Sequence, residues 1–142
     1  MKAIHKSKLL LLLLATVSLS ARSAEKTYGD LPKAELVRVK DGDTFVVTVP
    51  SWPAIVGYEI PVRVRGINSP EIHSKRPENK KLAIKAKNFT SDALWQAKII
   101  TIKDIRRDNF FRIDADVYVD GKSLAEMLLK AGLAKKYGEY WE

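Results

Sequence analysis

The stretch VRVRGINSPEI, residues 62–72, combines a strand, a turn and a carboxylate. Valines alternate with Arg63 and Arg65 up to a glycine, a pattern typical of a strand with one buried face. The asparagine, serine and proline that follow predict a turn. Glu71 comes directly after this turn, and Pro70 prevents a helix from joining Glu71 to Arg63. A planar cation, an oxygen-rich turn and a carboxylate within so short a stretch are what chemistry on phosphate requires.

The composition indicates one globular domain. The 142 residues are enough for a hydrophobic core, and 46% hydrophobic with 30% charged residues is not typical of a disordered chain. Residues 1–24 hold four basic residues and no acid, so the rest carries 21 basic against 17 acidic residues, a net charge of +4. That balance is compatible with a polyanionic partner. The lack of cysteine excludes disulfides and thiolate chemistry. Of the two histidines, His5 lies within residues 1–24, so the single remaining His73 excludes a multi-histidine metal centre.

The first 24 residues have the order of a secretory signal peptide. Three lysines precede an apolar run at residues 9–17, and small residues follow it. The run is short for a transmembrane helix, and an uncleaved anchor is the alternative. We expect cleavage between Ala21 and Glu25. The mature protein would then be secreted or periplasmic, with no stable association with the membrane, and residues 1–24 are excluded from the fold.

The mature chain divides into an N-terminal arm at residues 25–35, which is expected to be loose, and one domain at residues 36–142. Alternating and β-branched residues predict a hairpin over residues 36–49, with a turn at Asp41-Gly42 and Asp43 at the start of its second strand. Further strands are expected at 59–66, 99–102 and 112–119, separated by a connection at 50–58 and a charged loop at 104–111. Trp52, Ile55 and Val56 in that connection are expected against the body of the domain, with exposure for binding as the alternative.

Two helices complete the pattern. Apolar residues at helical spacing predict a helix from about residue 78 to 97. Its stripe holds Leu82, Ala86, Phe89, Ala93 and Ala97, and Leu94 widens it. Ser123 and Glu126 form a capping box for a second, short helix, whose expected buried face holds Leu124, Met127, Leu128 and Ala131 and which ends at Gly132. The order β-β-β-α-β-β-α predicts a mainly β, α+β fold: a five-stranded OB-fold Greek-key barrel with an inserted helix and a short C-terminal helix.

Three separated blocks of the mature chain resemble the staphylococcal nuclease (thermonuclease) family. They are DGDT at 41–44, RVRGINSPE at 63–71, and the strand from Arg112 that leads into VYVDGKSLAEMLLKAGLAK at 117–135. The resemblance implies an OB-fold phosphodiesterase that uses calcium to cut DNA and RNA. It implies that Glu71 is the general base or orients water, and that Arg63 and Arg112 bind phosphate. Taken singly, either arginine would be interpreted as a residue on the exposed face of a strand.

The same resemblance implies the metal ligands. Asp43 would bind Ca²⁺ through its carboxylate, whereas the residue pattern alone favours an aspartate that caps a turn. Asn68 stands where the family has a second carboxylate ligand, so one formal charge is lost and metal affinity should fall or shift in preference. Ser69 stands where a threonine contributes its main-chain carbonyl. Phe111 is a second departure, since the family commonly has glycine between an aromatic residue and the arginine.

Residues for substrate contact are less sharply indicated. Lys75 and Lys80 belong to a basic run that either steers a nucleic-acid strand or is simply a solvated loop. Tyr137 and Tyr140 lie near the region where family tyrosines contact the nucleotide. We therefore expect an exported, monomeric, Ca²⁺-dependent nuclease, endonucleolytic and with little sequence specificity, acting on DNA or RNA. The alternative is a catalytically weakened OB-fold module that binds single-stranded nucleic acid, and a weaker third alternative is an exported interaction domain.

Overall fold

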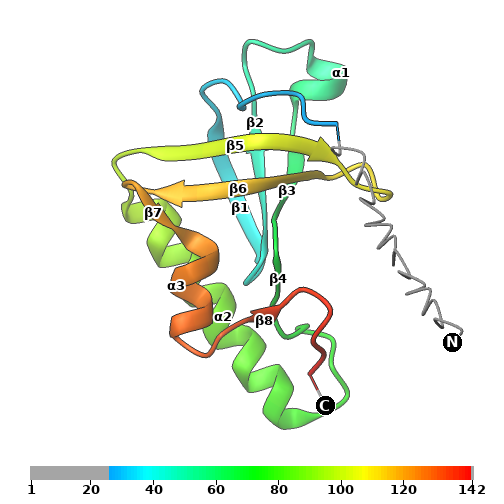
Figure 1. The fold of residues 1–142 in the computed structure, drawn as a ribbon, viewed down its shortest axis with the longest axis vertical. Coiled ribbons are helices and arrows are strands. Elements are labelled where there is room, and N and C mark those ends of the chain that lie inside the picture. The colour runs from blue at the N-terminus through cyan, green and yellow to red at the C-terminus, as the bar shows by residue number, and fades with distance from the viewer. Residues whose placement is uncertain (1–25, 142) are drawn as a thin grey trace, which may run out of the picture.

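The computed structural model describes residues 26–141, so the expected signal peptide at residues 1–24 lies outside the described residues. A curled antiparallel sheet with one parallel pair forms the body of the molecule, and two helices, α2 and α3, pack below it (Figure 1). In the sheet the strands follow the order β1-β2-β3-β6-β5. Among the described residues, no helix is long and apolar enough to cross a membrane.

The first three strands form a meander around the expected hairpin. β1 (Glu35–Asp41) pairs antiparallel with β2 (Thr44–Thr48), and β2 pairs antiparallel with β3 (Ile60–Val64). The alternation in VRVR is confirmed, because Val62 and Val64 are fully buried while the arginines between and after them are only partly buried. The register places Arg63 opposite Thr44, so β2 begins at the site where β3 ends.

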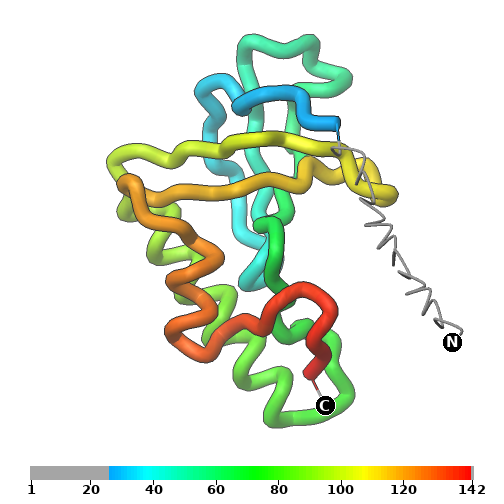
Figure 2. The backbone as a smooth tube through the Cα atoms, viewed as in Figure 1, coloured from blue at the N-terminus to red at the C-terminus, as the bar shows by residue number. Residues whose placement is uncertain are grey.

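The second half of the sheet returns to the first through a parallel pair. β5 (Ile100–Arg107) and β6 (Ile113–Val119) are antiparallel, β6 lies parallel to β3, and β7 (Lys122–Ser123) pairs with β6. A separate ladder joins β4 (Ile67–Asn68) to β8 (Lys135–Lys136), which brings the C-terminal segment beside the turn at residues 68–70 (Figure 2). This arrangement agrees with the predicted OB-type α+β fold.

The helices cover one end of the sheet. α2 (Pro77–Gln96) begins at a proline in its first turn and contacts β1 and α3. Its buried residues are Ala83, Ala86, Thr90 and Leu94, and Phe89, Ala93 and Ala97 are partly buried against the core. The expected stripe is therefore confirmed except at Leu82, beside which Ala83 is buried instead. α3 (Leu124–Lys130) has the expected Ser123 cap, whose hydroxyl accepts from the Glu126 N–H at 3.3 Å. Ala131 is exposed rather than buried, because the helix ends there.

Three local expectations were wrong. The connection after β2 contains a short helix, α1 (Ala54–Gly57), in which Ile55 and Val56 are 94% and 47% exposed, so only Trp52 packs against the core as expected. Residues 104–107 continue strand β5 across a bulge instead of starting a loop. The N-terminal arm is not loose, because Tyr28, Gly29 and Leu31 exchange three main-chain hydrogen bonds with β5.

Candidate active site

The tight turn that carries Asp43 is packed against helix α2. Gly42 is buried, and a Cβ at this position would lie 2.7 Å from the Ala86 Cβ and 2.9 Å from the Ser69 Cβ. The Thr90 hydroxyl donates to the Gly42 carbonyl at 2.5 Å from inside the helix. Only glycine allows this close approach, so the DG pair fixes Asp43 by packing as well as by turn geometry.

Asp43 joins this turn to the turn after β4. The Ser69 N–H donates to Asp43 Oδ2 at 2.9 Å, the Asp43 N–H donates to Ser69 Oγ at 3.2 Å, and the Thr44 hydroxyl donates to Asp43 Oδ1 at 2.9 Å. Ser69 is 7% exposed. Its side chain therefore has a role that the sequence did not indicate: it links two turns that are far apart in the chain and holds the aspartate between them.

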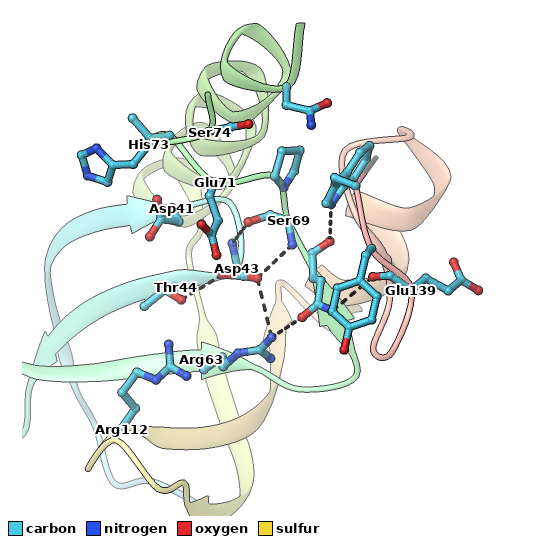
Figure 3. Close-up of a pocket in the computed structure, with 16 residues that line it drawn as sticks. Asp41, Asp43, Thr44, Arg63, Ser69, Glu71, His73, Ser74, Arg112 and Glu139 are labelled. Atoms are coloured by element: carbon cyan, nitrogen blue, oxygen red, sulfur yellow. Dashed lines mark hydrogen bonds and ion pairs between the residues drawn. The ribbon is translucent and has the colours of Figure 1, made fainter. Parts of the chain in front are cut away.

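Arg63 points into the same site and is held on several sides (Figure 3). Its Nη2 donates to Asn68 Oδ1 at 2.5 Å and to the Ile67 carbonyl at 3.0 Å, and lies 3.9 Å from Asp43 Oδ2. The ring of Tyr137 stacks 5.5 Å from the guanidinium carbon. Asn68 also donates from Nδ2 to the Glu139 carbonyl at 3.3 Å. The asparagine that departs from the family pattern thus positions the arginine, and its role as a metal ligand stays a prediction.

Arg112 reaches the site from the loop between β5 and β6. Asp108 organises that loop: its Oδ2 accepts from Arg112 Nε at 2.7 Å, and its Oδ1 accepts from the N–H groups of Phe110 and Arg112. Burial acts to raise the pKa of Asp108, but the hydrogen bonds from Arg112 and Phe110 outweigh it and hold the pKa below its usual range. Phe111 has φ +59°, so the position where the family commonly has glycine keeps a glycine-like conformation with a bulky side chain.

Glu71 enters the site just past Pro70 and is exposed. Figure 3 shows its carboxylate above Asp43, facing the cleft toward Arg63 and Arg112. The three predicted catalytic residues and the three predicted metal-site residues all line one pocket. They come from the turn before β2, from β3, from β4 and the turn after it, and from the loop between β5 and β6, and the register of these strands brings them together.

The pocket is rich in carboxylates. It is lined by Asp41, Asp43, Glu71 and Glu139 against two arginines. Burial, and next the negative charge of Asp43, raise the pKa of Asp41, and Glu71 adds to this effect. Such repulsion is relieved by a bound cation, and carboxylate oxygens suit a hard one such as Ca²⁺. In the described part of the chain no three acidic or histidine side chains form a ready metal cluster, so main-chain oxygens or water would complete the coordination.

The predicted substrate contacts are divided. Tyr140 lines the pocket, whereas Tyr137 lines a neighbouring groove behind Arg63. Lys75 and Lys80 line neither cavity.

The site also contains residues that the sequence reasoning missed. The sequence pattern identifies Asp41 only as part of a turn, although two aspartates separated by glycine were a usable signal. The others are Asp108, Glu139 and Trp141, and the Trp141 Nε1–H donates to the Asn68 carbonyl at 3.2 Å. No local pattern marks these three, because their roles depend on loops and on the C-terminal segment.

The fold and the site define a small OB-type domain with two arginines and a cluster of carboxylates in one pocket. Residues 61–142 match the family described as Staphylococcal nuclease homologue, and the chain belongs to that family. The matched part begins after the hairpin that carries Asp43, so this aspartate lies outside it.

Two curated relatives are similar to this chain. An uncharacterized 38.1 kDa protein from Capnoides sempervirens is 30% identical over 129 residues, which cover 87% of this chain and 35% of the relative. The SPbeta prophage-derived endonuclease YokF from Bacillus subtilis (strain 168) is 35% identical over 110 residues, which cover 75% of this chain and 34% of the relative. The chain therefore spans about a third of the length of these relatives.

Proposed function

We propose that the protein is a nuclease that hydrolyses phosphodiester bonds of DNA or RNA with the help of Ca²⁺. One observation carries this proposal: Arg63, Glu71 and Arg112, which come from three separate segments, line a single pocket together with Asp43. Membership of the nuclease family and the name of the Bacillus relative support it. The expected contacts are to phosphate rather than to base edges, so little sequence specificity and internal cleavage are part of the proposal.

The two arginines would bind the phosphate. Their guanidinium forks match two phosphate oxygens and stabilise the negative charge that grows on the phosphoryl group during attack. Arg63 is held by Asn68 and Tyr137, and Arg112 by Asp108, so both are oriented before substrate arrives. This preorganisation lowers the reorganisation needed in the transition state.

Glu71 would act on the water. Its exposed carboxylate faces the cleft, where it can orient a water molecule and accept its proton as the water oxygen bonds to phosphorus and the leaving oxygen departs. Asp41 and Asp43 would hold Ca²⁺, with Ser69 and Asn68 adjacent to it. When bound, the ion supplies positive charge next to a phosphate oxygen.

The remaining parts of the proposal concern where and how the protein acts. The order of charged, apolar and small residues at positions 1–24 supports export to the periplasm or the medium. We propose a monomer, because the site is assembled from residues of one chain.

The test is a cleavage assay on the purified protein. Plasmid, single-stranded DNA and RNA are incubated with Ca²⁺, with Mg²⁺ and with chelator. We expect Ca²⁺-dependent cutting by the wild type, and a loss of at least about a hundredfold in kcat for Glu71→Gln and for Arg112→Ala. Melting temperatures within a few degrees of the wild type show that each variant is folded, and Asp92→Asn, on the exposed side of α2, is the matched control.

The alternative function has its own outcome in this assay. If the wild type binds single-stranded nucleic acid but cuts none of the substrates in any metal, the protein is a binding module. If either variant cuts as fast as the wild type, that residue has no part in the mechanism.

A further inference from the structure

A second groove, rich in arginine, adjoins the candidate active site and shares Arg63 and Arg112 with it. We call it the arginine groove. The active-site pocket holds four acidic residues, whereas the arginine groove holds five arginines and two aspartates. The residues that matter here are Arg63, Arg107, Phe110, Arg112 and Tyr137. A strand of phosphates leaving the active site on this side would run from an acidic, metal-binding region into a basic one.

Arg107 differs from the arginines already described. Arg63, Arg65 and Arg112 each lie within ion-pair distance of an aspartate. Among the described residues no carboxylate pairs with Arg107, although it lines the groove at the end of β5. Its main chain is opposite Ile113, the residue after Arg112, so the strand pairing places Arg107 next to the active-site arginine. A cation without a carboxylate partner beside a phosphate site is suited to another anionic group.

Aromatic rings stiffen the arginines of this groove. Phe111 stacks 5.3 Å from the Arg107 guanidinium carbon, Phe110 stacks 5.2 Å from that of Arg112, and Tyr137 backs Arg63. Phe111 is 77% exposed and has φ +59°. A bulky residue with positive φ is strained, and a ring that lies mostly in solvent contributes little to the core. The contact with the Arg107 guanidinium is therefore the main interaction of the Phe111 side chain.

We propose that Arg107, stiffened by Phe111, binds the phosphate next to the scissile one, and that the protein therefore takes an extended single strand. This inference rests on the proposed function. The exposed rings of Phe110 and Tyr137, which are 76% and 73% exposed, flank the groove. They offer faces to unpaired bases, which a duplex keeps stacked inside the helix. Arg107 would thus make the site prefer a strand with several phosphates over a minimal diester.

Binding, rather than cleavage, tests this proposal. The full chain is titrated, in chelator, with a fluorescent hexathymidylate and with a thymidine dinucleotide that contains one phosphate. The variants are Arg107→Ala, Phe111→Asn and the control Lys98→Ala, whose lysine is an exposed cation beyond the opposite end of β5. Asparagine accepts a positive φ, so Phe111→Asn removes the ring without adding backbone strain.

We expect Arg107→Ala to weaken binding of the hexamer about fivefold and to remove the preference for the hexamer over the dinucleotide. The slope of log K against log salt should become shallower by about 0.7, the value expected when a single strand has one phosphate fewer neutralised by the protein. Phe111→Asn should weaken binding of the hexamer about threefold at an unchanged or higher melting temperature. If Arg107 had only a structural role, replacing it would leave the salt slope unchanged.

Three results would overturn the proposal. They are a salt slope for Arg107→Ala equal to that of Lys98→Ala, a wild type that binds the two oligonucleotides equally, and a DNA hairpin with a G·C stem, titrated in parallel, bound as tightly as the single strand. The experiment is independent of the nuclease proposal, because it needs no cleavage. If the wild type cuts plasmid but its binding of the hexamer does not depend on Arg107, the proposed function is supported and this inference is refuted. If hexamer binding depends on Arg107 but no plasmid is cut, this inference is supported and the proposed function is refuted.

Discussion

Gly42→Ala probes how tightly the turn that carries Asp43 is packed. The added methyl group would lie 2.7 Å from the Ala86 Cβ and 2.9 Å from the Ser69 Cβ, about 1 Å inside ordinary carbon contacts. Neither neighbour can rotate away, because each Cβ is fixed to its own main chain. Overpacking of this kind costs about 1–3 kcal/mol, and a strained hydrogen bond from Thr90 adds about 1 kcal/mol.

The expected loss is therefore about 3 kcal/mol, or roughly 10 °C in melting temperature for a domain of this size. Urea unfolding followed by circular dichroism measures it. Gly121→Ala is the matched control: Gly121 has φ +81° and open space around its Cβ position, so alanine there adds only backbone strain of about 1 kcal/mol. If Gly42→Ala is no more destabilising than Gly121→Ala, the close contact between this turn and α2 does not exist as described. Nuclease activity should also fall at temperatures where the variant is still folded, since the turn positions Asp43.

Three further predictions concern charge in the site. Asn68→Asp should tighten Ca²⁺ binding by about tenfold or more, because a unit charge near a divalent ion contributes about 2 kcal/mol even in water. Calorimetry measures the affinity for Ca²⁺, and an unchanged affinity would place Asn68 away from the ion. Asp108→Asn should lower kcat/KM by about tenfold with a small change in melting temperature, since Arg112 loses its charged partner; full activity would show that Arg112 needs no such support. Asp41 has a raised pKa, so in the metal-free protein its contribution to stability falls as pH rises from about 4 through that pKa. Asp41→Asn should therefore be more stable than the wild type near pH 7, with the gain lost below about pH 4 in urea unfolding, and equal stability at every pH would contradict the repulsion.

Much of the fold was predictable because the local signals agree with one another. The alternation around Arg63, the DG turn before Asp43 and the helix N-cap at Ser123 each describe a short segment, and the structure confirms each. The exposed α1 was missed, because an apolar residue such as Ile55 in a short connection is ordinarily expected to be buried.

The assembly of the site could be inferred only in part. Sequence patterns show which face of a strand is buried, but they do not show which groups meet across 26 residues, as Asp43 and Ser69 do. The hydrogen bond from Arg63 to Asn68 was hidden for a further reason: the resemblance compares the asparagine with the family's carboxylate ligand and does not indicate a partner for the arginine. Asp108 gave no periodic signal, because its role depends on the shape of a loop.

The pairing of the N-terminal segment with β5 has a consequence for the behaviour of the protein in solution. An edge strand of a sheet offers its unpaired N–H and C=O groups to other chains, and sheets aggregate through such edges. Tyr28, Gly29 and Leu31 occupy these groups on β5. Cleavage between Ala21 and Glu25 would leave this protective segment on the mature chain, whereas trimming beyond Leu31 would expose the edge of β5 to self-association.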